Sequence, residues 1–313
     1  MKIITLNQVA PFTDDFFITT LNDKQKDAIV ICNPSDSVCL APAYLRSRKT
    51  LEEHIRYVQD NQIKKAMVVG EDIRFLTQCS SLEYLSVHPS FTAENFDFSP
   101  LYEMPNIRWL QCDTIYGPEE DRISHIDYSR IKGLQRLAIS GAKGHHNVNQ
   151  VVTLQEFHFG KGQPVSDSLQ NAFDGRNLQT LSLLQSPVRT LDGLESAQHL
   201  RHLQLAYNRR LEDISSLSLV KDSLVSLEIE NCGKVHDFSI LSQLHNLERL
   251  VLKGSNKIPS LSFVGNMKKL KVLVFYMNVE DGDLSMCLPI PYVKIQNRKH
   301  YSHKDSDFAK GSR

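Results

Sequence analysis

Few residues in this chain have types and spacings that suit chemistry. His145 and His146 stand next to each other in the loop "GAKGHH", and imidazoles are common ligands for divalent metal ions. Neighbouring residues rarely converge on one ion, and no Cys or carboxylate stands at a suitable spacing, so we expect a solvated loop and no metal site. The other Gly-rich loop, "GKG" at 160–162, lacks the spacing of a phosphate-binding loop.

The common catalytic motifs are also absent from the sequence. It contains no GxxxxGK[ST], no HExxH and no GxSxG. His125 near Asp127 and His236 beside Asp237 are better interpreted as surface or capping residues at turns. No nucleophile, base and orienting group can be assembled from the sequence, so we predict that the chain is not an enzyme and uses no cofactor.

The composition predicts a soluble protein of the cytoplasm. Lys plus Arg and Asp plus Glu number 36 each among 313 residues, so the basic excess typical of nucleic-acid and membrane binding is missing. The first residues do not form a signal peptide, and no apolar run approaches the roughly 20 residues of a membrane helix. The cysteines form no CxxC pair and are expected to be reduced, mostly buried thiols, with a Cys32 to Cys39 disulfide as the alternative.

One short pattern recurs along the chain: an apolar residue, two others, an apolar residue, one other and a third apolar residue. Successive starts lie 19 to 27 residues apart, and the four steps from Leu178 to Leu270 are 22, 24, 23 and 23. Periods of this length are typical of solenoids. The clear copies start at Leu82, Ile107, Leu134, Leu154, Leu178, Leu200, Leu224, Leu247 and Leu270, with weaker copies at Ile63 and Ile290.

The spacing within each copy predicts a strand. The last two apolar residues are two apart, so both point into a core while the residue between them points to solvent. One such unit buries too little to fold alone, and stacking in parallel on its neighbours supplies the missing core. We therefore expect Leu203, Leu227 and Leu250 to stack as neighbours. Small polar residues eight positions after the start are expected to satisfy backbone groups at the turn, namely Ser90, Ser186, Asn208, Cys232, Ser255 and Asn278.

This arrangement resembles the leucine-rich repeats, "LxxLxLxxN/C", over roughly residues 63 to 295. Segments such as "FDFSPL", "IDYSRI", "LEDISSL", "VHDFSIL" and the degenerate "VEDGDLS" are similar to the "IxDISPL" segment of the bacterial internalin-like class. The resemblance implies an α/β solenoid with a curved parallel sheet on its concave face and short helical turns on its convex face. Asp and Ser in these segments are expected to cap the turns. Irregular steps in the first half of the chain require loop insertions.

Three parts are expected in the chain. Residues 1–62 form an N-terminal cap, with a strand in "DAIVICNP" that ends at Asn33-Pro34 and a helix over about 50–61. Thr50 and Glu53 have the spacing of a capping box, and Leu51, Ile55 and Val58 form the predicted buried stripe. Residues 63–295 form the solenoid, with about 9–11 repeats, and 296–313 form a polar tail that frays after covering the last repeat. A separate small binding domain at the N-terminus is the alternative.

The outward positions of the predicted strands and the residues just after them form one surface for a partner. Trp109 is the only tryptophan in the chain and takes an outward position, unless it tucks against the insertion "DTIYGPEEDRISH". Glu228 with Glu230 and Arg249 with Lys253 give neighbouring patches of opposite charge. The predicted contact residues are Tyr84, Trp109, Arg136, Glu156, His158, His202, Gln204, Tyr207, Glu228, Glu230, Arg249, Lys253 and Tyr276.

The resemblance and this surface together predict a non-catalytic protein-interaction module. We expect a monomer in the cytoplasm of a bacterium that binds a protein partner on its concave face. One version is an inhibitor or immunity-type protein that occludes a toxin or an enzyme, and the alternative is a scaffold that joins two proteins. A third hypothesis is an enzyme with its site in the N-terminal segment, for which the sequence offers no residues.

Overall fold

The computed structural model describes residues 18–19, 28–32, 49–90, 93–116, 122–141, 143–161 and 167–308. The chain forms two compact units, 1–147 and 148–313, and each is described by itself. The Asn33-Pro34 turn and the side chains of Cys32 and Cys39 lie outside the described residues. The expected boundaries at 62/63 and 295/296 stay a prediction.

The first unit is built on strands in the order β1-β2-β3-β4-β5-β9. β1 and β2 are antiparallel, and every later neighbour in this unit is parallel. The bounds are β1 Ile18–Thr19, β2 Ala28–Cys32, β3 Lys65–Gly70, β4 Tyr84–Pro89, β5 Trp109–Asp113 and β9 Arg136–Ser140. Inward residues such as Leu85 and Leu110 pair in register and have no exposed surface, so the predicted alternation of core and surface is confirmed.

The single described α-helix, α1 (Leu51–Asp60), is close to its predicted range. Its capping box is present, because the Glu53 N–H donates to Thr50 Oγ1 at 3.2 Å and the Thr50 N–H donates to the Glu53 carboxylate at 2.7 Å. The predicted buried stripe is partly wrong. Val58 is buried, but Leu51 is 40% exposed and His54 takes the inward position. Leu51 is the first residue of the helix and lines an open pocket with Val68 and Phe75, which leaves part of its surface exposed.

The second unit repeats the same plan, with strands in the order β11-β12-β13-β14-β15-β17-β19 and parallel pairing throughout. Leu203 pairs in register with Leu227, and Leu227 with Leu250, so the predicted stacking is confirmed. The bounds are β11 Glu156–Gly160, β12 Thr180–Leu184, β13 His202–Ala206, β14 Ser226–Glu230, β15 Arg249–Lys253, β17 Val272–Phe275 and β19 Tyr292–Ile295.

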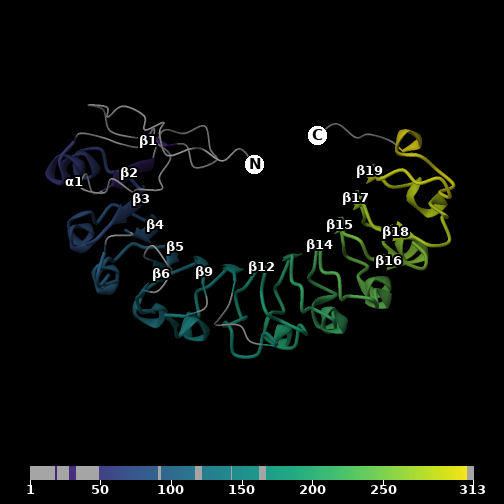
Figure 1. Ribbon diagram of the computed structural model, residues 1–313, viewed down its shortest axis with the longest axis horizontal. Helices are drawn as coiled ribbons and strands as arrows, with labels where there is room; N and C mark the ends of the chain where they lie inside the picture. Colours follow the sequence, from purple (N-terminus) through teal and green to yellow (C-terminus); the bar gives the residue numbers. More distant parts are fainter. Residues whose placement is uncertain are drawn as a thin grey trace. The chain divides into compact units, whose positions relative to one another are not determined.

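Short helical turns take the side of each unit opposite to the strands, as the coils outside the labelled strands show in Figure 1. They are 3₁₀ turns: η2 Arg74–Gln78, η3 Ser99–Glu103, η4 Tyr128–Arg130, η5 Val148–Gln150, η6 Leu194–Ser196, η7 Ser215–Val220, η8 Ser239–Gln243, η9 Ser262–Asn266, η10 Ser285–Cys287 and η11 Asp305–Asp307. Three two-residue pairs join neighbouring loops, namely β6 Ile115–Tyr116 with β7 Arg122–Ile123, β8 Ile126–Asp127 with β10 His145–His146, and β16 Lys257–Ile258 with β18 Asn278–Val279.

Aspartates cap the start of these turns, as the sequence predicts. The Asp213 carboxylate accepts the Ser215 N–H at 2.7 Å, and Asp237 accepts the Ser239 N–H at 2.8 Å. The same bond recurs in the segments of Asp97, Asp127 and Asp283. Each carboxylate pairs with an N–H that has no partner within the turn, so the Asp-x-Ser spacing fixes where the helical turn begins.

Residues in the left-handed region follow several strands. Gln185, Tyr207 and Asn231 have φ values of 54°, 56° and 52°. The N–H of Tyr207 donates to the Glu230 carbonyl at 2.8 Å, one strand further along the sheet. Gly254 takes this place after β15 with a φ of 146°. The left-handed residue turns the chain out of the strand, so the next side chain is directed back into the core.

Buried polar side chains then complete the turns. Asn208 is fully buried, donates to the Leu183 carbonyl at 3.0 Å and accepts the Ser186 N–H at 2.7 Å. Ser90, Ser186 and Cys232 are also buried, as expected. Ser255 is exposed and Asn278 is half-buried, so the prediction is wrong for these two. Asn256 is buried instead and donates to the carbonyls of Cys232 and Val235. The turn after β15 contains one more residue than the turns before it, so the buried polar position is shifted by one after Gly254.

Asn208→Ala is expected to lower the free energy of unfolding by about 2 kcal/mol, because a buried N–H and a buried carbonyl lose their partner. Urea unfolding followed by circular dichroism measures this change. Asn149→Ala is the control, since Asn149 is exposed in the same unit and should leave the midpoint unchanged. Equal midpoints for Asn208→Ala and the unmodified chain would contradict the role given to Asn208.

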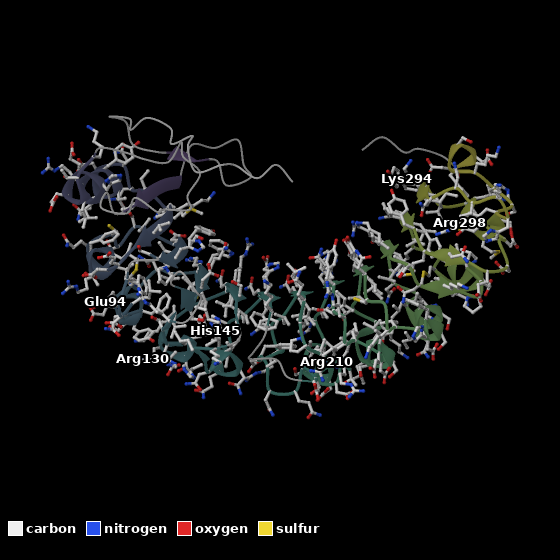
Figure 2. The ribbon with its side chains drawn as sticks, in the orientation of Figure 1. Glu94, Arg130, His145, Arg210, Lys294 and Arg298 are labelled. Atoms are coloured by element: carbon white, nitrogen blue, oxygen red, sulfur yellow. The ribbon has the colours of Figure 1, made fainter. Side chains whose placement is uncertain are left out.

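The polar residues after β19 are bonded to the last repeats rather than frayed, at least to residue 308. The Ile295 N–H and the Lys294 ammonium (labelled in Figure 2) donate to the Asp305 carboxylate at 3.0 and 2.5 Å. Tyr301 accepts the Val279 N–H and donates to the Met277 carbonyl, and Phe308 is buried. The prediction that this tail frays is therefore wrong for these residues, while its covering of the last repeat is confirmed.

Candidate functional site

In each unit, the outward residues of the strands and the residues directly after them form what we call the sheet face of that unit. Every predicted contact residue lies on one of these faces and none is buried. Tyr84 is on β4, Trp109 on β5 and Arg136 on β9 in the first unit. In the second unit, Glu156 and His158 are on β11, His202 and Gln204 on β13, Glu228 and Glu230 on β14, and Arg249 and Lys253 on β15, while Tyr207 and Tyr276 directly follow β13 and β17.

Two aromatic side chains lie side by side on the face of the first unit. Tyr84 pairs in register with Trp109, and Trp109 with Arg136. The Lys65 ammonium is 5.7 Å from the centre of the Tyr84 ring on the other side. Both aromatic residues are half-buried. The row therefore offers planar apolar surface flanked by cationic side chains.

Charged residues on the face of the second unit pair with one another. Glu228 accepts from Arg249 and from Lys253, each at 3.3 Å, and Glu230 accepts from Lys253 at 3.2 Å. Burial lowers the pKa of Lys253, but the hydrogen bonds that its ammonium donates to both carboxylates outweigh this effect, and the net pKa is raised. Val251 lies between the two cationic residues on β15 and is fully buried although it takes an outward position. The predicted patches of opposite charge thus neutralise each other.

Apolar surface lies beside this ion-pair group. Leu184 at the end of β12 is 46% exposed, and Tyr207 is 41% exposed. The Tyr207 hydroxyl donates to the Glu230 carboxylate at 3.0 Å, which holds the ring next to the charged group. A partner would gain most here by covering Leu184 and Tyr207, because the neighbouring charges are already satisfied.

The structure also assembles a polar cluster that the sequence did not reveal. Ser86 and His88 are two apart on β4, and Asp113 ends β5. His88 Nε2 is 2.8 Å from Ser86 Oγ, and His88 Nδ1 is 2.8 Å from Asp113 Oδ2. The Ser140 hydroxyl donates to the other Asp113 oxygen. The structure thus brings a serine, a histidine and a carboxylate into hydrogen-bond contact, an arrangement that could not be assembled from the sequence.

A second polar group adjoins the first at Ser140 and surrounds His145, which Figure 2 labels among the side chains of the first unit. Cys112 Sγ is 3.0 Å from the Tyr128 hydroxyl, and this hydroxyl is 2.7 Å from His145 Nδ1. On the other side of the ring, Nε2 is 3.2 Å from the Ser140 carbonyl and 3.1 Å from Thr114 Oγ1. A carbonyl accepts only, so Nε2 carries the proton and Nδ1 accepts from Tyr128.

Burial dominates the acid–base properties of this group. It lowers the pKa of His145 from 6.5 to about 4, although the Ser140 carbonyl and Asp113 act in the opposite direction. Burial also raises the pKa of Tyr128 far above its ordinary value. Both side chains are therefore neutral at pH 7, which the proton arrangement described above requires.

The two adjacent histidines of the "GAKGHH" loop do not converge. The His146 ring stacks on the His125 ring with their centres 5.1 Å apart, and His146 Nε2 is 2.8 Å from His125 Nδ1. His145 points into the polar group instead. Within the described residues, no group of three His, Cys, Asp or Glu side chains is placed to hold a metal ion.

The described cysteines are free and buried, as predicted: Cys79, Cys112, Cys232 and Cys287. Burial raises the pKa of the Cys79 and Cys232 thiols to about 11 and that of Cys287 to about 12. Protonated thiols are poor nucleophiles, so these side chains serve packing rather than chemistry. In the part of the chain that the structure describes, no helix is long and apolar enough to cross a membrane.

No protein-family profile and no curated protein matches the chain. Solved structures do match. An internalin from Listeria monocytogenes is 17% identical, with 80% of this chain and 72% of that chain covered and a TM-score of 0.56. A leucine-rich-repeat protein from Leptospira interrogans is 15% identical, with coverage of 80% and 71% and a TM-score of 0.50. TLR13 in its complex with ssRNA13 is 17% identical, with coverage of 75% and 39% and a TM-score of 0.51.

At these identities the likeness concerns the fold. It agrees with the parallel strands, the 3₁₀ turns and the Asp-x-Ser caps found in both units. The chain therefore has the leucine-rich-repeat fold, a solenoid of parallel strands and short helical turns similar to that of the internalins.

Proposed function

We propose that the chain is a protein-interaction module that binds a protein partner on its sheet face. The leucine-rich-repeat fold supports this, because solenoids present extended surfaces of strand residues to their partners. In our proposal the module acts as a monomer in the cytoplasm, as an inhibitor or immunity-type protein that occludes a toxin or an enzyme. A scaffold that joins two proteins is the alternative.

The observation that carries the proposal is the row formed by Tyr84 and Trp109. Two large aromatic residues share neighbouring positions on one face and are both partly open to solvent. Aromatic side chains and arginine dominate the binding energy of protein interfaces, and Arg136 is next in the row. The paired charges in the second unit weigh against a nucleic-acid partner, which needs a continuous track of one sign.

Replacing Tyr84 and Trp109 together by alanine is expected to weaken partner binding at least about 30-fold, the equivalent of a hot spot of roughly 2 kcal/mol. The measurement has two steps. Affinity capture with the unmodified chain from its host first identifies a stoichiometric partner, and calorimetry with the purified partner then compares the affinities. The melting temperature should stay nearly unchanged, because neither ring belongs to the core.

The matched control is Leu219→Ala with Leu288→Ala. These side chains are 43% and 48% exposed, and both lie away from the strands, in η7 and just after η10. The control should retain the full affinity. Equal losses in both double variants would place the binding surface elsewhere. Unfolding of the aromatic variant would assign the two rings to the core, where Trp109 would pack against the insertion.

The inhibitor and scaffold versions differ in what the partner does when bound. An inhibitor should abolish the partner's enzymatic or toxic activity at one equivalent, and the neighbouring gene should encode that partner. A scaffold should leave the activity intact and allow a second protein to bind at the same time. An enzyme site within residues 1–62 is the third hypothesis. Catalytic activity that is retained after deletion of residues 1–62 would exclude this hypothesis.

A further inference from the structure

The polar cluster on β4 and β5 has one consistent arrangement of protons. Hydrogen bonds from His88 and Ser140 outweigh the effect of burial and keep the pKa of Asp113 below its ordinary value, so Asp113 is an ionised acceptor. His88 Nδ1 must then donate to it across 2.8 Å. In the neutral form of the His88 ring, the lone pair is consequently on Nε2, and the Ser86 hydroxyl donates to that atom across 2.8 Å.

We propose that Ser86 is a nucleophile that accepts small acyl groups, with His88 as its general base and Asp113 as the residue that orients His88. The order of donors and acceptors is the one that serine hydrolases use on several unrelated folds, where roles and geometry rather than sequence position define the site. This activity is additional to partner binding, and a partner seated on Tyr84 and Trp109 would block it.

The strands hold these groups firmly. Ser86 and His88 share a face of β4 because they are two residues apart. Asp113 stands at the matching height on β5, one step beyond the paired Val87 and Cys112. Its second oxygen accepts from Ser140 on β9, so Asp113 is fixed from both sides. A base that is oriented in this way needs no rearrangement before it takes up a proton.

The surroundings define the class of substrate. Gln111 is opposite Ser86 in register on the same face, and its amide is the candidate donor to the developing oxyanion. Tyr84 and Trp109 lie on the same face, two residues before Ser86 and Gln111 along their strands, and can stack on a planar leaving group. Ser86 is only 1% exposed, whereas the His88 side chain is 24% exposed. Only a small acyl group reaches the hydroxyl, after the side chains beside it move apart. The geometry points to an acetyl-sized ester of an aromatic alcohol.

The chemistry needs water as its only other reactant. Ser86 Oγ forms a bond with the ester carbonyl carbon while its proton moves to His88 Nε2. The bond to the leaving oxygen then breaks, and the alcohol departs with that proton. Water attacks the acyl-serine by the same route, and the products are the free carboxylic acid and the restored hydroxyl.

Two reagents test the proposal on the full chain. Methanesulfonyl fluoride, which is close to an acetyl group in size, should add one methylsulfonyl group per chain, with loss of fluoride, and peptide mass spectrometry should place it on Ser86. The chain should hydrolyse p-nitrophenyl acetate with multiple turnovers, so that more than one nitrophenol is released per protein molecule. Labelling of another residue, or a chain that stays unlabelled and inactive, would overturn the assignment and leave the cluster as a structural hydrogen-bond chain.

Variants separate the roles from a loss of fold. Ser86→Ala should abolish labelling, and His88→Gln should slow it about a hundredfold. Asp113→Asn should also slow it, because the ring loses its fixed tautomer. Ser182→Ala is the control, since Ser182 occupies the same outward place on β12 and donates to Gln204. It should react like the unmodified chain. Circular dichroism verifies each fold, and full reactivity of a folded Ser86→Ala would refute the proposal.

Discussion

Leu227→Ala is expected to lower the free energy of unfolding by about 3–4 kcal/mol. Leu227 has no exposed surface and lies in register between Leu203 and Leu250. Truncation removes apolar contacts with both neighbours and leaves a cavity that parallel strands cannot close, because their spacing is fixed by backbone hydrogen bonds. Chemical denaturation followed by circular dichroism gives the change in the free energy of unfolding.

The same substitution at an outward leucine gives the matched comparison. Leu184 ends a strand of the same unit but is 46% exposed. Leu184→Ala should change the free energy of unfolding by less than about 0.5 kcal/mol. Similar losses in the two variants would show that the strands are not stacked with the alternation described here, and the sheet face would then be wrongly assigned.

Acid is expected to destabilise the first unit between pH 6.5 and pH 4. Burial lowers the pKa of His145 in the folded chain to about 4, while its ordinary value is 6.5. Above pH 6.5 the ring is neutral in both states and the stability is full. As the pH falls, the unfolded chain takes up the proton first, so the stability decreases until the folded ring is protonated near pH 4. The total loss is at most about 3 kcal/mol.

His145→Gln tests this origin. Glutamine cannot take up a proton, so the stability of this variant should vary less between pH 6.5 and pH 4, although its stability at pH 7 is lower. The control is His202→Gln at an exposed position of the second unit, which should keep the full slope. Denaturant midpoints of the three proteins at several pH values provide the measurement. Parallel curves for all three would mean that His145 does not cause the acid effect.

The repeat could be predicted because its signal is local. Three apolar residues within six positions define each strand, and Asp-x-Ser defines the start of each turn. Both features depend on neighbours in the sequence, so the strands of the second unit and the caps at Asp213 and Asp237 follow from the pattern. The capping box of α1 is local in the same sense.

The failures occur where one residue changes the register. The extra position at Gly254 moves the buried amide from Ser255 to Asn256, and counting residues from Leu247 does not reveal this. At α1 the pattern favoured Leu51 over His54, since hydrophobicity alone does not tell which residues of a helix the neighbouring elements cover.

The polar cluster depends on contacts between strands. Ser86 and His88 are visibly two apart, but Asp113 is 25 residues after His88 and reaches it only through the pairing of β4 with β5. Aligning the repeats would have placed Asp113 beside His88, because both stand six positions after the start of their copies. The same alignment would have paired Glu230 with Lys253 and placed Glu228 diagonally between Arg249 and Lys253, and so would have indicated that these charges cancel.

The ion pairs of the second unit affect how fast a partner can arrive. Because Glu228 and Glu230 are satisfied by Arg249 and Lys253, this region projects little electric field into solution. Encounters there would rely on ordinary diffusion without long-range attraction. The association rate at this region should consequently be nearly the same in dilute buffer and in concentrated sodium chloride, and discrimination between partners would come from shape and dehydration.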